Sequence, residues 1–390
     1  MSWADQQSMT LGWPGAGSTE RPRHSDRTIL LLTLLLVAIG LGMIYSASGV
    51  LAHKRFGDAS YFFKRQLLWL AVGLVCMLVV ARTDLGTLRR WALPVLFLGL
   101  IGLILVLLPG VGVMVKGARR WLRIGALTIQ PSEFVKVGIL LYLAHYLAKK
   151  GDRITSFRRG FTPPLVVVGV LIGLIVIEPD MGTAAVIGLV TLGLLFVGGA
   201  RLGHLMLIGL AALPVVYLLV MRVAYRRQRM LSFLDPWSDP TGTGFQAIQS
   251  FLALGSGGPF GVGLGEGRQK LFYLPEPHTD FVLSALGEEL GFIGTVMVVL
   301  LLGLFVAKGF AIALEADDPF ARYLALGVSL LVGFHTLINV SVITGMLPTK
   351  GLTLPFLSYG GSSLVVNMIG AGFLLAVSRH RPPICSGRCA

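Results

Sequence analysis

The sequence predicts an all-α polytopic membrane protein with about ten transmembrane helices and a large extracytoplasmic loop between the seventh and eighth. Two observations lead to this prediction. Hydrophobic residues make up 54% of the 390 residues and charged residues only 13%, with a mean hydropathy of +0.78. A soluble fold cannot bury so much apolar surface with so few charges. Charge-poor runs also recur along the chain at the length that a helix needs to cross a bilayer.

The spans follow one another with short polar connections, and the fourth contains a charge near its start, Lys136. Residues 1–27 are polar, with three arginines just before the first apolar run, and are expected to form a disordered cytoplasmic tail. Residues 28–380 form the membrane domain and residues 381–390 a second cytoplasmic tail. The expected spans are 29–50, 63–81, 91–112, 133–148, 161–178, 181–200, 203–221, 283–307, 322–344 and 361–378.

The distribution of basic residues predicts the orientation. The chain has 33 Lys+Arg against 19 Asp+Glu, a net charge of +14. Short loops carry more Lys and Arg on the cytoplasmic side, and placing both termini inside satisfies this rule once the long loop is left out. Nearly half of the basic residues then face outward. In a membrane protein this charge does not indicate a nucleic-acid partner; it predicts an anionic ligand at the outer face.

The outer loop, residues 222–282, begins with Arg222, Arg226 and Arg229 at helical spacing. This spacing favours a helix with a basic face lying on the membrane surface, although snorkelling at a helix end explains one or two of the arginines. The glycine-rich segment 255–267 matches no nucleotide-binding pattern. It predicts a compact loop in which backbones approach closely.

Asp280 lies where this loop meets the eighth span, among apolar and aromatic residues. A partly desolvated carboxylate is a stronger base, so Asp280 is a candidate general base. The alternative is a helix N-cap, a common role of aspartate. Glu288 and Glu289 suit the positive end of the helix dipole, but acids within a span are also functional candidates.

Three further outer segments contain polar residues: 116–136, Glu178-Pro-Asp180-Met-Gly-Thr183, and the proline-broken segment 347–363. A bland turn or loop explains each segment singly, but irregular backbone near membrane depth usually lines a cavity. The seven histidines show no paired metal spacing, and His145, His204 and His335 are expected to pack between helices. The three cysteines form no disulfide framework.

Several motifs together resemble the SEDS family of bacterial cell-wall proteins. They cover about residues 28–380 in the expected order. The segment Leu347-Pro-Thr-Lys-Gly-Leu-Thr353 resembles the cell-division members more than the elongation members. The motifs are Tyr45-Ser-Ala-Ser48, Arg120-Trp121 with Gln130-Pro-Ser-Glu-Phe134, Glu178-Pro-Asp-Met-Gly-Thr183, Asp235-Pro-Trp237, Gly244-Phe-Gln246, His278-Thr-Asp-Phe281 with Gly287-Glu-Glu-Leu-Gly291, and Ser358-Tyr-Gly-Gly-Ser-Ser363.

The resemblance implies a peptidoglycan glycosyltransferase that polymerises lipid II at the outer face of the inner membrane during septal wall synthesis. The acceptor 4-hydroxyl attacks the donor anomeric carbon with inversion, and undecaprenyl pyrophosphate leaves. Asp280 matches the essential loop aspartate of the family and becomes the expected base. Arg120, Lys136 and Lys270 are expected to neutralise the leaving group. The other expected substrate contacts are Glu178, Asp180, His278, Glu289, Lys350 and Ser358.

The resemblance also implies partners: a class B penicillin-binding transpeptidase and membrane proteins of the division complex. No protein metal site is expected, although a Mg or Mn ion at the pyrophosphate would suit the chemistry. Two other functions stay open. A lipid II flippase would use polar groups within the bundle, such as Lys136, Glu178 and Asn339. A non-catalytic scaffold of the division complex would not need Asp280.

Overall fold

The computed structural model describes residues 26–115, 117–125, 127–268 and 277–380. The tails predicted at residues 1–27 and 381–390 lie almost entirely outside this part, as does Lys270. The helices are α1 (Arg27–Phe56), α2 (Tyr61–Arg82), α3 (Leu85–Leu107), α4 (Pro131–Lys150), α5 (Thr162–Ile177), α6 (Met181–Val197), α7 (Leu202–Met221), α8 (Ala224–Leu234), α9 (Phe245–Gly257), α10 (Val282–Leu314), α11 (Pro319–Ile343) and α12 (Gly361–Arg379), and the strands are β1 (Gly112–Val115), β2 (Ala118–Ile124) and β3 (Leu127–Ile129).

The helical membrane architecture is confirmed. Among the described residues, eight helices are long and apolar enough to cross a membrane by length and composition. Each of the ten predicted spans corresponds to a helix, but α6 has only 17 residues, and α4 carries the charged pair Glu133 and Lys136. The number of helices that cross the bilayer therefore stays a prediction.

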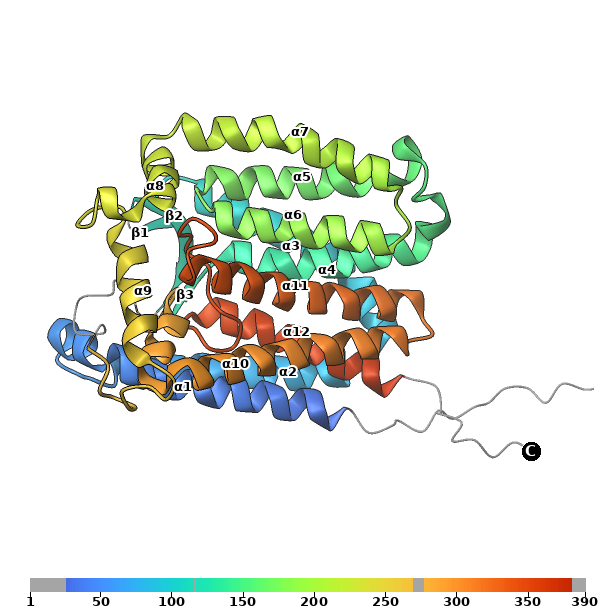
Figure 1. The fold of residues 1–390 in the computed structure, drawn as a ribbon. Coiled ribbons are helices and arrows are strands. Elements are labelled where there is room, and N and C mark those ends of the chain that lie inside the picture. The colour runs from blue at the N-terminus through green and yellow to red at the C-terminus, as the bar shows by residue number, and fades with distance from the viewer. Residues whose placement is uncertain (1–25, 116, 126, 269–276, 381–390) are drawn as a thin grey trace, which may run out of the picture.

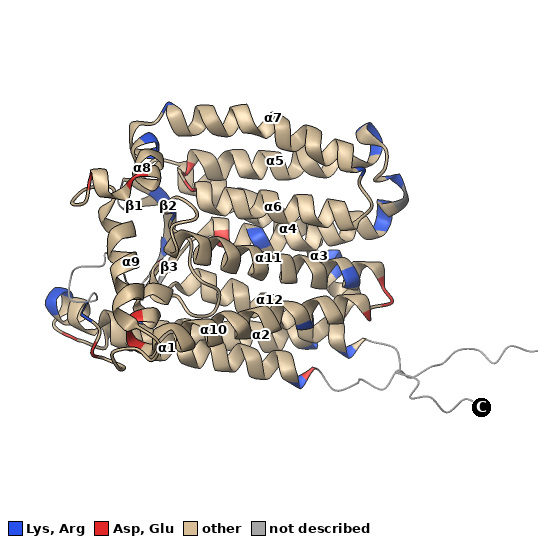
Figure 2. Cartoon of the chain, in the orientation of Figure 1, with Lys and Arg blue, Asp and Glu red and all other residues tan. Residues whose placement is uncertain are grey.

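The long helices run side by side in one bundle (Figure 1). Helices α8 and α9 and the three strands lie together at one end, which we call the sheet end. The first residue of α1 and the last of α12 lie at the opposite end, where the main-chain N–H of Asp26 donates to Ser378 Oγ at 3.1 Å. Charged residues gather at the two ends of the bundle (Figure 2). The two described ends of the chain thus lie at the same end of the bundle (Figure 1), as an even number of spans predicts.

Burial is uneven among the helices. The most apolar 18-residue stretch of α12 is 83% buried, whereas none of the corresponding stretch of α7 is buried. Helix α4 packs closely on α3 because Gly138 presents no side chain: a Cβ there would stand 2.9 Å from Leu96 Cα. The protein core therefore lies around α4, α11 and α12, and α7 lies at the periphery (Figure 1).

The connection between α3 and α4 differs from the prediction of a third span reaching residue 112. Helix α3 ends at Leu107, and residues 112–129 form an antiparallel sheet in the order β1-β2-β3. Pro109 and Gly110, whose φ is +86°, follow the last turn and stop the helix. The turns between the strands contain Gly117 and Gly125, with φ of +77° and +62°, which glycine adopts without strain.

The segment 222–282 bears out one prediction fully and one in part. Arg226 and Arg229 lie on α8, whereas Arg222 is the C-cap of α7, so the predicted basic helix forms without Arg222. The glycine-rich loop packs closely on a kink of α10 at Gly291, and the N–H groups of Val262 and Gly263 donate to the carbonyls of Glu288 and Glu289 at 3.0 and 3.1 Å. Glycines are needed here because a Cβ on Gly261 would stand 2.2 Å from Glu289 O.

Candidate functional site

Asp280 lies in the turn that leads into α10 and is partly exposed. The N-cap position of α10 is Phe281, one residue after Asp280, and no side-chain cap is present among the described residues. The alternative role of Asp280 as the N-cap is therefore wrong. The main chain of Asp280 is held by Asn339 of α11, whose Nδ2 donates to Asp280 O at 3.0 Å. Its carboxylate lies beside Gly351, where a Cβ would stand 3.2 Å from Oδ2. Asp280 is therefore fixed through its backbone next to the segment 344–360.

The segment 344–360 is ordered by polar contacts within the protein. The N–H of Tyr359 donates to His278 O at 2.8 Å, and the buried His278 ring lies 4.6 Å from the Phe62 ring. Ser358 is buried, and its Oγ accepts from the N–H of Leu354 at 2.8 Å. The described contacts of His278 and Ser358 thus fix the shape of the loop around Asp280.

Lys350 belongs to the same segment and precedes Gly351. Burial lowers the pKa of its ammonium group. A cation that has lost part of its hydration gains from an anion placed beside it. Lys350 is therefore suited to meet a negatively charged group near Asp280.

A second polar cluster lies at the turn between α5 and α6. Arg120 of β2 donates through Nε to Glu178 O at 2.9 Å and through Nη2 to Pro179 O. Asp180 caps α6 by accepting from the N–H of Thr183, and it also accepts from Gln130 Nε2 at 3.2 Å. The sheet is thereby anchored to the α5–α6 turn.

Glu178 is 1% exposed, and neither of its carboxylate oxygens has a hydrogen-bond partner among the described residues. Burial raises the pKa of Glu178 to about 8; nearby Asp180 raises it further, and Arg120 opposes the shift. The carboxyl group is accordingly neutral over most of the physiological pH range.

Lys136 and Glu289 occupy separate buried contacts. Lys136 Nζ lies 2.8 Å from the Glu133 carboxylate and 3.2 Å from His335 Nε2, and its side chain is 3% exposed. Glu289 accepts from Ser46 Oγ at 2.6 Å and from the N–H of Gly265 at 3.2 Å. A direct role of either residue in binding substrate stays a prediction.

The structure brings most of the predicted residues to the sheet end in two adjoining groups. One consists of Asp280, His278, Lys350 and Ser358, and the other of Arg120, Glu178 and Asp180. The two groups are neighbours: Gly182 at the start of α6 packs on Leu352 of the segment 344–360, so closely that a Cβ on Gly182 would stand 2.9 Å from the Leu352 side chain. Sequence reasoning did not assign Asn339 to Asp280. The available signal was a lone amide within an apolar span, which usually has a specific partner.

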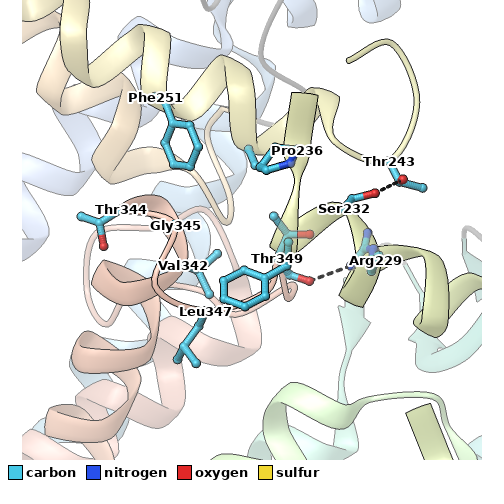
Figure 3. Close-up of a pocket in the computed structure, with 12 residues that line it drawn as sticks. Arg229, Ser232, Pro236, Thr243, Phe251, Val342, Thr344, Gly345, Leu347 and Thr349 are labelled. Carbon is cyan, nitrogen blue, oxygen red and sulfur yellow. Dashed lines mark hydrogen bonds between the residues drawn. The ribbon is translucent and has the colours of Figure 1, made fainter. Parts of the chain in front are cut away.

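A cavity of about 170 Å³ opens beside these groups, between α8, α9 and the end of α11. Arg229 crosses one side of it and donates to Thr349 O at 3.2 Å, and Ser232 hydrogen-bonds Thr243 (Figure 3). Thr349 lines the cavity, whereas Gly351, two residues further on, lies beside Asp280.

A metal site receives no support from the described residues, which contain no group of three His, Cys, Asp or Glu side chains able to hold an ion. The expectation of a Mg or Mn ion held at a pyrophosphate stays a prediction.

The family model of the cell cycle proteins FtsW, RodA and SpoVE matches residues 26–382. The chain is 50% identical over 353 residues to the probable peptidoglycan glycosyltransferase FtsW of Trichlorobacter lovleyi, covering 90% of this chain and 93% of the relative. It is 45% identical over 362 residues to the stage V sporulation protein E of Bacillus subtilis, covering 93% and 99%.

Solved structures agree with these relatives. A chain from the structure described as "Structural coordination of polymerization and crosslinking by a peptidoglycan synthase complex" superposes with a TM-score of 0.75 at 33% identity, covering 91% of this chain and 98% of that one. The rod shape determining protein RodA of Thermus thermophilus superposes with a TM-score of 0.68 at 31% identity, covering 92% and 97%. The chain therefore belongs to the SEDS family of FtsW, RodA and SpoVE.

Proposed function

We propose that the protein is a peptidoglycan glycosyltransferase that polymerises lipid II at the outer face of the inner membrane during septal wall synthesis. The sheet end is then the outer end, and both termini are cytoplasmic. The activity is the one named for the relatives with 50% and 47% identity. Its partners would be a class B penicillin-binding transpeptidase and membrane proteins of the division complex. The 33% identical chain belongs to a peptidoglycan synthase complex that coordinates polymerization and crosslinking, which favours such a partner.

The observation that carries the proposal is the contrast between Asp280 and the buried acids of the sheet end. Glu178, Asp180 and Glu289 are each at most 4% exposed. Asp280 is partly exposed in a segment whose backbone is held by a buried amide. A general base needs both access to substrate and a fixed position, and Asp280 meets both requirements.

In the proposed reaction, Asp280 takes the proton of the acceptor 4-hydroxyl as that oxygen attacks the anomeric carbon of the donor. The new C–O bond forms on the face opposite the pyrophosphate, the old C–O bond breaks with its electrons, and the α-linked donor becomes a β-linked product. Pyrophosphate leaves as a stable anion, so one carboxylate base is sufficient, unlike the pair that glycosidases use.

Cations at the same end would stabilise the charge that develops on the leaving group. Lys350 is next to Gly351, which lies beside Asp280. Burial lowers the pKa of Lys350, and a bound anion would offset the cost of burying its charge. Arg120 uses two of its donors to hold the α5–α6 turn and still contributes a positive charge. Lys350 is therefore our first choice for contact with pyrophosphate, and Arg120 our second.

The experiment uses the purified full chain in detergent with fluorescent lipid II, alone and with a class B penicillin-binding transpeptidase added. We expect glycan chains from the native protein and at least about 100-fold fewer from Asp280→Asn, because the lost base contributes on that order. Asp239→Asn is the matched control, since Asp239 hydrogen-bonds only its own loop in the described structure.

Two results would contradict the proposal. Absence of glycan from the native chain, with and without the added transpeptidase, would favour the flippase or the scaffold, because transport has no meaning in detergent. Polymerisation by Asp280→Asn at the native rate would be compatible with the polymerase function, but it would show that Asp280 is not the general base.

A further inference from the structure

The cavity between α8, α9 and the end of α11 has a lining typical of a carbohydrate site. Hydroxyl groups come from Ser232, Thr243 and Thr349, and an aromatic face comes from Phe251 (Figure 3). Sugar rings combine hydroxyls around their edge with apolar C–H faces, so mixed pockets of this kind suit them. The volume of about 170 Å³ is close to that of one pyranose ring.

The charge of the lining residues further limits the kinds of ligand that the cavity could bind. Among the described residues that line the cavity, Arg229 is the only ionisable one, and none is an acid. One guanidinium nitrogen donates to Thr349 O, which leaves other N–H groups of its five for a ligand. The described lining therefore favours a neutral or anionic ligand over a cation.

The cavity is next to the proposed base without containing it. Thr349 lines the cavity, and Gly351, two residues further on, lies beside the Asp280 carboxylate. One short segment therefore separates the cavity from the proposed base. The main chain of this segment is held from the cavity side by Arg229 and from the core by Asn339, which donates to Leu352 O at 2.9 Å. A ligand in the cavity would lie near the reacting sugars but outside the reacting centre.

We propose that the cavity is a saccharide subsite for a sugar of the glycan strand that does not itself react. The proposal rests on the proposed polymerase function. The subsite would hold the strand between successive transfers. Binding there would increase the length of the glycan without changing the rate at which the first glycosidic bond forms. Binding energy from parts of a substrate remote from the reacting atoms is a general means of positioning the chain.

The variant that tests the subsite is Ala247→Phe, which fills the cavity from α9. Leu252→Phe is the matched control: it adds a ring on the same helix at a position that is 46% exposed and does not line the cavity. Both proteins are assayed with fluorescent lipid II in detergent. Product length is read from gels, and the first transfer from the initial rate of lipid-linked tetrasaccharide formation.

For Ala247→Phe we expect the mean glycan length to fall at least about threefold while the first-transfer rate stays within about twofold, because the substitution removes remote binding only. The control keeps the native length. An unchanged length distribution for Ala247→Phe would contradict the proposed subsite without affecting the proposed polymerase function. An equal loss of first transfer and of length, in folded protein, would also overturn it, because the cavity would then belong to the reacting centre.

Direct binding provides a second measurement, which does not depend on glycan synthesis. In saturation-transfer NMR with chitotetraose, a β-1,4-linked N-acetylglucosamine oligomer, we expect signal transfer from the native chain that Ala247→Phe reduces and Leu252→Phe preserves. Equal transfer from all three proteins would contradict the subsite. Absence of glycan synthesis by the native chain would instead count against the polymerase function.

Discussion

The side-chain amide of Asn339 joins two segments that meet at the proposed base: Nδ2 donates to Asp280 O at 3.0 Å and to Leu352 O at 2.9 Å. Asn339 is 2% exposed and lies on α11, a well-packed helix. Because both contacts are to main-chain oxygens, Asn339 determines where Asp280 and the 344–360 segment lie relative to each other. We regard it as a positioning residue.

Replacing Asn339 by Leu should lower kcat roughly 10- to 100-fold, because a small displacement of a catalytic group has effects of that size. KM should change much less, since Asn339 is buried below the surface that substrate would contact. Steady-state polymerisation by the folded fraction of the variant provides both constants.

Asn367→Leu is the matched control for this prediction. Asn367 is also a buried amide, but its Nδ2 donates to Ser363 O within its own helix, α12. Its replacement should change stability without a selective fall in kcat. A parallel loss of kcat in both variants would show that Asn339 acts through general packing.

Glu178 should make stability depend on pH. Its pKa is raised from 4.5 to about 8 in the folded protein, so between these values the native state holds a proton that the unfolded chain has released. The contribution of Glu178 is therefore fully present below pH 4.5 and is lost as pH rises through about 8. The apparent unfolding temperature in detergent should fall across this window, and Glu178→Gln should flatten the fall.

The control for Glu178 is Glu266→Gln, because Glu266 is exposed. This variant should follow the native pH dependence. If Glu178→Gln also follows the native curve, then Glu178 is not the group that holds the proton.

Arg120 should not be replaceable by Lys. Nε and Nη2 reach the carbonyls of two successive residues, Glu178 and Pro179, and an ammonium group cannot reproduce this planar pair of donors. Arg120→Lys should therefore destabilise the protein by roughly 1.5–3 kcal/mol, the range for hydrogen bonds that involve a charged group. Thermal unfolding of the detergent-solubilised protein measures the change.

Arg123→Lys on the same strand provides the comparison, because Arg123 is exposed and its guanidinium donates to the nearby Gly125 O at a long 3.4 Å. Arg123→Lys should change the stability of the protein only slightly. Equal stability of the native protein and Arg120→Lys would mean that positive charge alone is needed at position 120.

The helices were predictable because each apolar run is long enough to span a bilayer, and this depends on composition alone. The sheet at residues 112–129 was not predicted, since its short strands carry Arg119, Arg120 and Arg123 and resemble a polar loop. Its turns were nevertheless readable from Gly117 and Gly125. Short strands of this kind are specified by their pairing more than by their residues.

The candidate site was predictable only in part. The position of Asp280 at the junction of a loop and a span suggested a base from local sequence. The contact of Arg120 with Glu178 and that of Asn339 with Asp280 each join residues more than 50 positions apart. No local pattern indicates such pairs, because they depend on how the helices pack.

The pair of Glu133 and Lys136 provides the last prediction, since it decides whether Lys136 stabilises the fold or contacts substrate. Lys136→Met leaves the Glu133 carboxylate buried without its cation, which should destabilise the protein by about 3–5 kcal/mol. The double variant Glu133→Gln/Lys136→Met removes both charges and should recover much of this loss. Unfolding of the native protein, Glu133→Gln, Lys136→Met and the double variant gives the coupling energy of the pair. Lys136 Nζ also contacts His335, whose Nε2 must accept from it. The substitution His335→Leu should therefore lower the stability more when it is made in the native protein than when it is made in the double variant. If Lys136→Met instead unfolds like the native protein and loses polymerisation alone, then Lys136 acts on substrate.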